Sequence, residues 1–362
     1  MENLFAYYEY LHAHPELSKQ EAQTCAYLMD TLEKMGYQPK RAGQYGVYAD
    51  LQVDETLPWV MLRSDMDALP VIEETGVPYA SQNPGVMHAC GHDSHMAMLL
   101  TAAEMLQGKS LPQNIRFLFQ PAEEGVTGAK EMVEAGVIPA NTAAVFGMHV
   151  WPGVEKGKVL AKVGALMASP TTIQIRVKGL GAHCGIRERG NDALMTMAQI
   201  LVRSKEAESL SNGDGTILFF GKLHSGTSHN IVASEAIMNG TLRTYYPDTR
   251  EKVLAKLEEI VAETAAAYST EAEVIYSSFA PAVINPEELT KRVQKLLPNV
   301  LTDIAPTRIA EDFSRYQEHA PGVLMWLGVG DTPSLHNGKF LPPREVLPAG
   351  VDTWLRLAQH KW

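Results

Sequence analysis

Short apolar runs that each end in a polar cluster constrain the fold of this chain more than any other feature. Helical segments at 94–106 and 129–135 separate them, and the four runs lie at 60–62 (before RSDMD), 115–119 (before QPAEEG), 143–147 (before MHVWPG) and 322–327 (before GVG). Strands that alternate with helices predict an α/β fold with a mainly parallel sheet and helices on both faces. Because ligands bind at the carboxyl edge of such sheets, we expect the four clusters to form one site.

The pattern changes between residues 168 and 277. Strands are expected at 172–177, 216–223, 235–244 and 271–277, and helices at 192–203 and 250–267. Their order, β-α-β-β-α-β, is typical of a ferredoxin-like α+β domain. The strand at 322–327 then returns to the earlier pattern. The sequence therefore predicts a main domain of residues 1–167 and 278–362, interrupted by an inserted domain of residues 168–277.

The composition excludes several classes of partner. The 362 residues include 31 Lys and Arg against 42 Asp and Glu, and this net charge of −11 repels nucleic acids and anionic membranes. No apolar run approaches the ~20 residues needed to cross a bilayer. The N-terminus, MENLFAYYEY, lacks the features of a secretory signal, which predicts a cytoplasmic protein. Three widely spaced cysteines, Cys25, Cys90 and Cys184, indicate reduced thiols rather than disulfides.

The string MHACGHDSH is the densest group of potential metal ligands. It places His88, Cys90, His92 and His95 within eight positions, directly before a predicted helix. A thiolate combined with imidazoles suits Zn²⁺ or another late transition metal. His88 and His95 could instead support the ligands or cap the helix, whereas Cys90 and His92 are the stronger candidates for direct binding.

Two adjacent glutamates, Glu123 and Glu124, follow the strand at 115–119. Side chains of neighbouring residues at a strand end point in different directions, so one glutamate can bind a metal while the other faces the substrate. His149 and His336 follow or end other strands of the same pattern. A lone histidine is usually structural. His149 and His336 become candidate metal ligands because the other polar clusters are expected at the same edge of the sheet.

Asp65 and Asp67, in RSDMD, could bind metal or could orient the ligating imidazoles as outer carboxylates, and we favour the outer role for Asp67. The residues together predict an enzyme with one or two metal ions, an unligated glutamate and a separate second domain. That combination is typical of metal-assisted hydrolysis.

The same motifs resemble the aminoacylase and carboxypeptidase family of co-catalytic metallohydrolases. The branch that they resemble contains hippurate hydrolases, plant auxin-conjugate amidohydrolases and N-acetyldiaminopimelate deacetylases. The matching strings span nearly the whole chain in the family's order: LHAHPELS, RSDMDALP, MHACGHDSHMA, FQPAEEG, GMHV, GTSHNIV, GTLRT, AEDFS and LHNGKF. The resemblance implies a di-metal peptidase-like catalytic domain with an inserted ferredoxin-like lid.

The resemblance also implies a role for individual residues. Glu123 would be the general base, and the ligands of two divalent ions would be Cys90, His92, Glu124, His149 and His336. In the wider family a His-x-Asp pair stands where this chain has Asp65 and Asp67, so the resemblance does not make Asp65 a ligand.

Residues of the lid are implied to contact the substrate. The positions of His183, Asn230 and Arg243 match such residues, and in several members the histidine acts across a homodimer formed through the lid. Asn230 and Arg243, thirteen residues apart, are expected to face one pocket. Branch members commonly carry a Pro-His pair where GAHCGIRERGND has Arg187 and Glu188, a departure that bears on the choice of substrate.

The resulting prediction is an amidohydrolase that cleaves the amide bond of small N-acyl amino acids. Zinc, manganese, cobalt and nickel are all compatible with the ligands. A metallo-dipeptidase is an alternative within the same class. A cysteine hydrolase would use Cys90 as nucleophile with His92 or His149 as its base. A non-catalytic metal- or peptide-binding protein is a further alternative, but such a protein has no need of the unligated Glu123.

Overall fold

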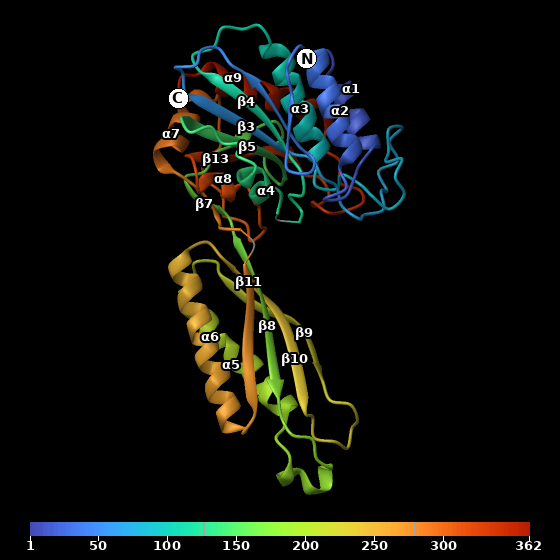
Figure 1. The fold of residues 1–362 in the computed structure, drawn as a ribbon, viewed down its shortest axis with the longest axis vertical. Coiled ribbons are helices and arrows are strands. Elements are labelled where there is room, and N and C mark those ends of the chain that lie inside the picture. The colour runs from blue at the N-terminus through green and yellow to red at the C-terminus, as the bar shows by residue number, and fades with distance from the viewer. Residues whose placement is uncertain (126, 279) are drawn as a thin grey trace. The chain divides into compact units, whose positions relative to one another are not determined.

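The computed structural model describes residues 1–125, 127–278 and 280–362 and divides into two compact units. The first unit consists of Met1–Leu166, Val283–Ala305 and Glu311–Trp362, and the second of Met167–Ala282 and Pro306–Ala310. Each unit has its own hydrophobic core. Figure 1 shows the elements of both units.

A seven-stranded mixed sheet forms the centre of the first unit. Its order is β1 (Lys40–Ala42), β2 (Gly46–Leu51), β4 (Asn114–Gln120), β3 (Trp59–Asp65), β5 (Thr142–Pro152), β13 (Gly322–Gly330) and β6 (Val159–Leu160). The four central strands, β4, β3, β5 and β13, run parallel to one another. The outer pairings of β1 with β2, β2 with β4 and β13 with β6 are antiparallel.

The prediction of a mainly parallel sheet therefore needs correction, although the α/β class is confirmed. The sequence pattern located the parallel centre because those strands are long and buried. It missed β1, β2 and β6 because β1 and β6 are very short and β2 is only partly buried, which weakens the apolar signal.

Helix α3 (His92–Leu106) is the most deeply buried helix of this unit. Almost every side chain along α3 is buried, so all faces of this helix pack inside the unit. This burial is typical of a core helix. It contacts β3 and β5, and α1 (Leu4–Ala13) and α9 (Leu347–Gln359) pack against it (Figure 1). The remaining elements of the unit are α2 (Ala22–Lys34), α4 (Gly128–Glu134), α7 (Glu287–Leu296), α8 (Ser314–Gln317), the 3₁₀ turn η2 (Arg344–Val346) and the small sheet of β7 (Gly164–Met167) and β12 (Val283–Asn285).

The second unit contains a four-stranded antiparallel sheet and two long helices. The sheet order is β11 (Glu271–Ser278), β8 (Ser169–Lys178), β10 (Glu235–Thr244) and β9 (Ile217–Ser225). Helices α5 (Ala193–Ser209) and α6 (Pro247–Ala267) pack on each other and on the sheet (Figure 1). The six expected elements are present in the expected order, with the 3₁₀ turn η1 (Cys184–Arg189) added between β8 and α5.

A buried ion-pair group fastens α1 to the start of α3. His12, on α1, lies with Nδ1 2.6 Å from Asp93 Oδ2 and Nε2 3.0 Å from Glu73 Oε1. Burial lowers the pKa of His12, but the hydrogen bonds and charges of Asp93 and Glu73 outweigh burial and raise the pKa from 6.5 to about 9. The charged imidazole is therefore part of the folded state at neutral pH.

Replacing His12 with alanine should lower the free energy of unfolding by about 3–5 kcal/mol at pH 6, because two buried carboxylates lose their partner. Since the folded-state pKa is raised, this stabilisation is complete below pH 6.5 and is lost as the pH rises through about 9. Denaturant unfolding of the chelator-treated protein across this range measures the difference between His12→Ala and wild type. His14→Ala is the control, because His14 hydrogen-bonds to the Tyr10 carbonyl oxygen and stacks on the Tyr10 ring without contacting Asp93 or Glu73, and an equal effect in that variant would contradict the assignment.

Candidate metal centre

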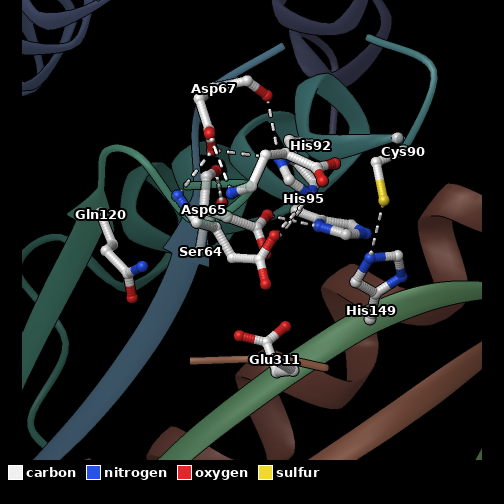
Figure 2. A network of polar contacts seen from close by, with 12 residues as sticks. Ser64, Asp65, Asp67, Cys90, His92, His95, Gln120, His149 and Glu311 are labelled. Atoms are coloured by element: carbon white, nitrogen blue, oxygen red, sulfur yellow. Dashed lines mark hydrogen bonds and ion pairs between the residues drawn. The ribbon is translucent and has the colours of Figure 1, made fainter. Parts of the chain in front are cut away.

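The predicted metal ligands gather at the carboxyl edge of the first unit's sheet. His92 is the first residue of α3, and Cys90 lies two residues before it. His149 lies within β5, Glu124 follows β4 and His336 follows β13. Figure 2 shows Cys90, His92 and His149 with Asp65, which ends β3, and Asp67, which follows it. Segments separated by up to 246 positions thus supply one cluster of donor atoms, Cys90 to His336.

Two groups of three potential ligands share Cys90. In the first group, donor atoms of Cys90, His92 and His149 all lie within 4.8 Å of one another, and in the second those of Cys90, Glu124 and His336 do. The Cys90 Sγ atom is 3.4 Å from His149 Nε2, and His336 Nε2 is 3.3 Å from Glu124 Oε1. All five predicted ligands therefore belong to one continuous cluster.

The imidazoles present lone pairs to this cluster. His92 Nδ1 lies 2.9 Å from the Asp67 carbonyl oxygen, and His149 Nδ1 lies 2.7 Å from the Val150 carbonyl oxygen. A carbonyl only accepts, so each Nδ1 carries a proton and, in the neutral ring, each Nε2 is left as an acceptor. His92 Nε2 is buried and has no hydrogen-bond partner. An imidazole held in this way is suited to bind a metal through Nε2.

The electrostatics of the cluster also fit a cation. Burial lowers the pKa of His92, but Asp65, Asp67 and Glu124 outweigh burial and raise it to about 10. Burial, followed by the charges of Glu124 and Glu123, raises the pKa of the Cys90 thiol well above its usual value. The surroundings therefore favour positive charge at the cluster and disfavour a free thiolate. Divalent ions would supply that charge and hold the sulfur as a thiolate.

Asp67 fixes both glutamates and His92 at once. Its carboxylate accepts the backbone N–H groups of Glu123 and Glu124, each at 3.0 Å, and the Ser18 hydroxyl at 2.6 Å. Its backbone carbonyl oxygen accepts a hydrogen bond from His92 Nδ1. Since both carboxylate oxygens already accept hydrogen bonds, the geometry agrees with an outer, orienting role.

The hydrogen bonds of His95 leave it no free ring nitrogen with which to bind a metal. Its Nδ1 lies 2.6 Å from Asp65 Oδ1, and its Nε2 accepts the Val150 backbone N–H at 2.8 Å. Both ring nitrogens are therefore engaged, which agrees with the supporting alternative. Asp65 is also held by Arg63, whose Nη1 donates to Oδ2 at 2.8 Å. His88 is buried with neither ring nitrogen hydrogen-bonded, and it belongs to no candidate ligand group among the described residues.

Comparison with known proteins identifies the family. Residues 61–360 match the model of peptidase family M20/M25/M40. The chain belongs to this family. It is 35% identical over 339 residues to the N-acetyl-L-cysteine deacetylase of Bacillus subtilis, covering 91% of this chain and 81% of that relative. It is 32% identical over 360 residues to an N-acetyldiaminopimelate deacetylase of Listeria monocytogenes, covering 97% of each.

A solved structure gives the same result. The crystal structure of the Bacillus subtilis YXEP protein, described as a dinuclear metal-binding peptidase of the M20 family, matches with a TM-score of 0.87 and 31% identity. The match covers 99% of this chain and 97% of that one. The resemblance drawn from the motifs is thereby confirmed at the level of family and reaction class.

In this M20 chain, a buried cluster of charges that sequence reasoning missed lies beside Glu123. Arg63 donates from Nη2 to Glu311 at 3.0 Å and to Asp312 at 3.2 Å. Carboxylate oxygens of Glu123, Glu311 and Asp312 lie within 4.8 Å of one another. Burial, followed by the charges of Glu311 and Glu124, raises the pKa of Glu123 well above its usual value. The string AEDFS was the only sequence signal for Glu311 and Asp312, and it did not predict a function for either residue.

Glu21 is a second residue that sequence reasoning missed. This fully buried carboxylate, at the start of α2, accepts the Ala122 backbone N–H at 2.8 Å. Ala122 has a φ of 51°, a left-handed conformation that is unfavourable for a residue with a Cβ. Together with Asp67, Glu21 thus anchors three consecutive N–H groups, those of residues 122 to 124.

Replacing Glu21 with alanine should lower kcat by roughly 10- to 100-fold with little change in KM, because the turn that aims Glu123 loses a supporting hydrogen bond. Glu21→Gln keeps an acceptor oxygen and should recover most of the rate. Steady-state kinetics at saturating metal measure both. The control, Glu16→Ala, removes a carboxylate that holds the N–H groups of Gln23 and Thr24 instead. A loss in Glu16→Ala as large as in Glu21→Ala would indicate a general effect on folding.

The predicted lid residues lie at two ends of the second unit's sheet. His183 and Asn230 lie on neighbouring segments, since Cys184 N donates to the Asn230 carbonyl oxygen at 3.0 Å. Asn230 precedes β10, whereas Arg243 lies near that strand's far end. The strand from Glu235 to Arg243 alone spans on the order of 27 Å at ~3.4 Å per residue. Asn230 and Arg243 were expected at opposite ends of a turn and strand that face one pocket, but the length of β10 places them too far apart to share a pocket within one chain.

Proposed function

We propose that this chain is a metal-dependent amidohydrolase that cleaves the amide bond of N-acyl amino acids, as its deacetylase relatives are named for doing. The observation that carries the proposal is the set of donors around Cys90 with a buried glutamate, Glu123, beside it. A thiol, imidazoles and a carboxylate suit late transition metals, and an adjacent free carboxylate suits proton transfer.

The proposed cofactors are two divalent ions, each bound by one of the two groups that share Cys90. His92 and His149 would complete one site, and Glu124 and His336 the other. Such ions, when bound, acidify water and polarise the amide carbonyl. Zinc, manganese, cobalt and nickel remain candidates, because this mixture of donors accepts each of them.

In the proposed mechanism Glu123 takes a proton from the attacking water and passes it to the departing amine. General acid–base catalysis of this kind contributes typically ~10²- to 10⁴-fold. Asp67 keeps Glu123 and Glu124 in place through their backbone N–H groups. His183 would stabilise the negative charge that develops on the carbonyl oxygen. Asn230 would contact the same part of the substrate.

Arg243 is proposed to bind the free carboxylate of the amino acid. Its side chain is half-buried and forms no hydrogen bond or ion pair with any described residue, and burial lowers its pKa. A guanidinium that is partly desolvated and unpaired is suited to bind a carboxylate with two parallel hydrogen bonds.

Residues 168–277 are proposed to form an inserted ferredoxin-like lid through which the protein forms a homodimer. The separation of His183 and Asn230 from Arg243 along β10 supports this, because the two groups can serve one substrate only if they come from different chains. Exposed apolar side chains on and near α5, Leu194, Met195 and Val202, supply surface for such contact. Among the described residues, no helix has the length and apolar character needed to span a membrane. The cytoplasmic location stays a prediction.

A cysteine hydrolase has one specific observation in its favour, the 3.4 Å contact between Cys90 Sγ and His149 Nε2. The raised pKa of Cys90 argues against it, since the carboxylates disfavour a thiolate that no cation neutralises. A metallo-dipeptidase would use the same centre, with a second amino acid in place of the acyl group.

One experiment separates these alternatives. Purified protein is assayed with each of the four metals on N-acetyl amino acids, N-benzoyl amino acids and dipeptides, before and after chelation. We expect hydrolysis of the acyl amino acids, lost on chelation and restored by metal. Activity that survives chelation but is abolished by a thiol alkylator would instead establish a cysteine hydrolase, and cleavage of dipeptides alone would establish a dipeptidase.

A further inference from the structure

The second unit contains a cavity of about 550 Å³ between the end of its sheet and the segment 306–310. This volume lies within the range of ~300–1,000 Å³ that small-molecule sites occupy. Apolar and hydroxyl-bearing side chains form most of its wall, and two arginines complete it: Ile217, Phe219, Thr241, Arg243, Pro306, Thr307, Arg308, Ile309 and Ala310. We call it the two-arginine cavity.

The charge of this cavity is opposite to that of the protein. The chain has a net charge of −11, yet the lining contains two guanidinium groups and no carboxylate. Neither Arg243 nor Arg308 forms an ion pair with a residue in the described ranges. Two guanidinium groups without a carboxylate partner in one cavity are suited to bind an anionic ligand.

The side chain of Arg308 is exposed, and a hydrogen bond holds it in place. Its Nε donates to the Gly215 carbonyl oxygen at 2.7 Å, which fixes the plane of the guanidinium and leaves both terminal nitrogens free to donate. The segment around it is also anchored, because Ala168 N donates to the Ile309 carbonyl oxygen at 3.1 Å and Tyr245 Oη donates to the Pro306 carbonyl oxygen at 3.3 Å. The cavity therefore presents two separate cationic groups, and the one on Arg308 is oriented by a hydrogen bond.

We propose that the two-arginine cavity selects N-acyl amino acids whose side chain carries a second carboxylate. Arg243 binds the α-carboxylate, Arg308 binds the side-chain carboxylate, and the methylene groups between them contact Phe219 and Ile309. The inference rests on the proposed function for the first of these contacts and goes beyond it in the second. A substrate with one carboxylate would form a charge-assisted contact with only one of the two guanidinium groups, so it lacks the contact that Arg308 offers to a second carboxylate.

N-acetyl-L-glutamate and N-acetyl-L-glutamine test the proposal, because they have nearly the same shape and differ in the charge that Arg308 would recognise. We expect wild type to prefer the glutamate derivative in kcat/KM by roughly tenfold or more, the worth of one charge-assisted contact at a partly exposed site. Arg308→Gln should reduce this ratio to about one. The matched control, Arg176→Gln, removes one charge from β8 at a residue that contacts Gln174 and Glu273, and it should keep the wild-type ratio.

Binding provides a second readout that separates this inference from the proposed function. Calorimetry on metal-loaded Glu123→Gln protein, with and without Arg308→Gln, gives the ratio of dissociation constants for the same two compounds. If wild type hydrolyses neither compound but binds the glutamate derivative more tightly through Arg308, the proposed hydrolysis fails and the inference stands. Equal kcat/KM for both compounds in wild type, or a preference that Arg308→Gln leaves intact, would overturn the inference while leaving hydrolysis in place.

Discussion

Glu123→Gln should lower kcat by about 10²- to 10⁴-fold while leaving metal content unchanged. Glutamine keeps the size of the side chain and the backbone N–H that donates to Asp67, so the turn that carries it stays in place. It cannot accept and return a proton as a carboxylate does. The side chain is buried beside the proposed ligands, within 4.8 Å of donor atoms of His92 and Glu124, which is where a base for the attacking water must lie.

Glu311→Gln is the matched control, because Glu311 is a buried glutamate of the same cluster. Its Oε1 accepts from Arg63 and from the Phe313 backbone N–H, so its hydrogen bonds are structural. We expect this variant to lose far less activity than Glu123→Gln. Single-turnover rates and metal analysis of both proteins decide the matter. A Glu123→Gln protein with more than a tenth of wild-type kcat, or a larger loss in Glu311→Gln, would assign the base elsewhere.

Much of the fold was predictable because it rests on signals that are local in sequence. The central strands are continuous buried runs, and β10 begins and ends at the predicted residues, 235 and 244. The edge strands were missed because β1 has three residues and β6 has two, which is too short for periodicity to register. The mixed character of the sheet followed from those missed strands.

The site was predictable only where its residues lie in distinctive short strings. Cys90 and His92 are recognisable because thiol and imidazole side chains are rarely so close in sequence without a role. Arg63 and Glu311 are separated by 248 positions, and an arginine within a strand or an acid within a loop is ordinary until the fold joins them. Glu21 was missed for the same reason, since its function depends on a backbone N–H 101 positions away.

Arg63 and Glu21, which were missed, and Asp67, which was predicted, all support the ligand group from outside. Arg63 partly neutralises the carboxylates that surround the cluster, and Glu21 and Asp67 hold the turn that bears both glutamates. Asp67 and the Val150 carbonyl fix the imidazoles so that their lone pairs face the ligand group. The donor set is thus held in place by hydrogen bonds within the protein, and Cys90 belongs to both of its groups.

Because Cys90 belongs to both groups of ligands, Cys90→Ala should weaken binding of both metal ions, whereas His336→Ala should weaken only one. Each site has few protein donors, and loss of a direct ligand should lower its affinity by more than the ~10- to 100-fold typical of outer-shell changes. Equilibrium dialysis against zinc followed by metal analysis should therefore give about two ions per chain for wild type, about one for His336→Ala and fewer than one for Cys90→Ala.

His88→Ala is the control for these variants, because His88 is a buried imidazole of the same string and belongs to no ligand group within the described part of the chain. This variant should retain both ions. The comparison of metal content among the three variants is more informative than the metal lost by any one of them. A structural collapse would remove metal from all three variants, which circular dichroism of the metal-free proteins would reveal. If Cys90→Ala and His336→Ala each lost one ion and kept the other, Cys90 would serve a single metal, and the proposed sharing of its thiolate between two ions would be wrong.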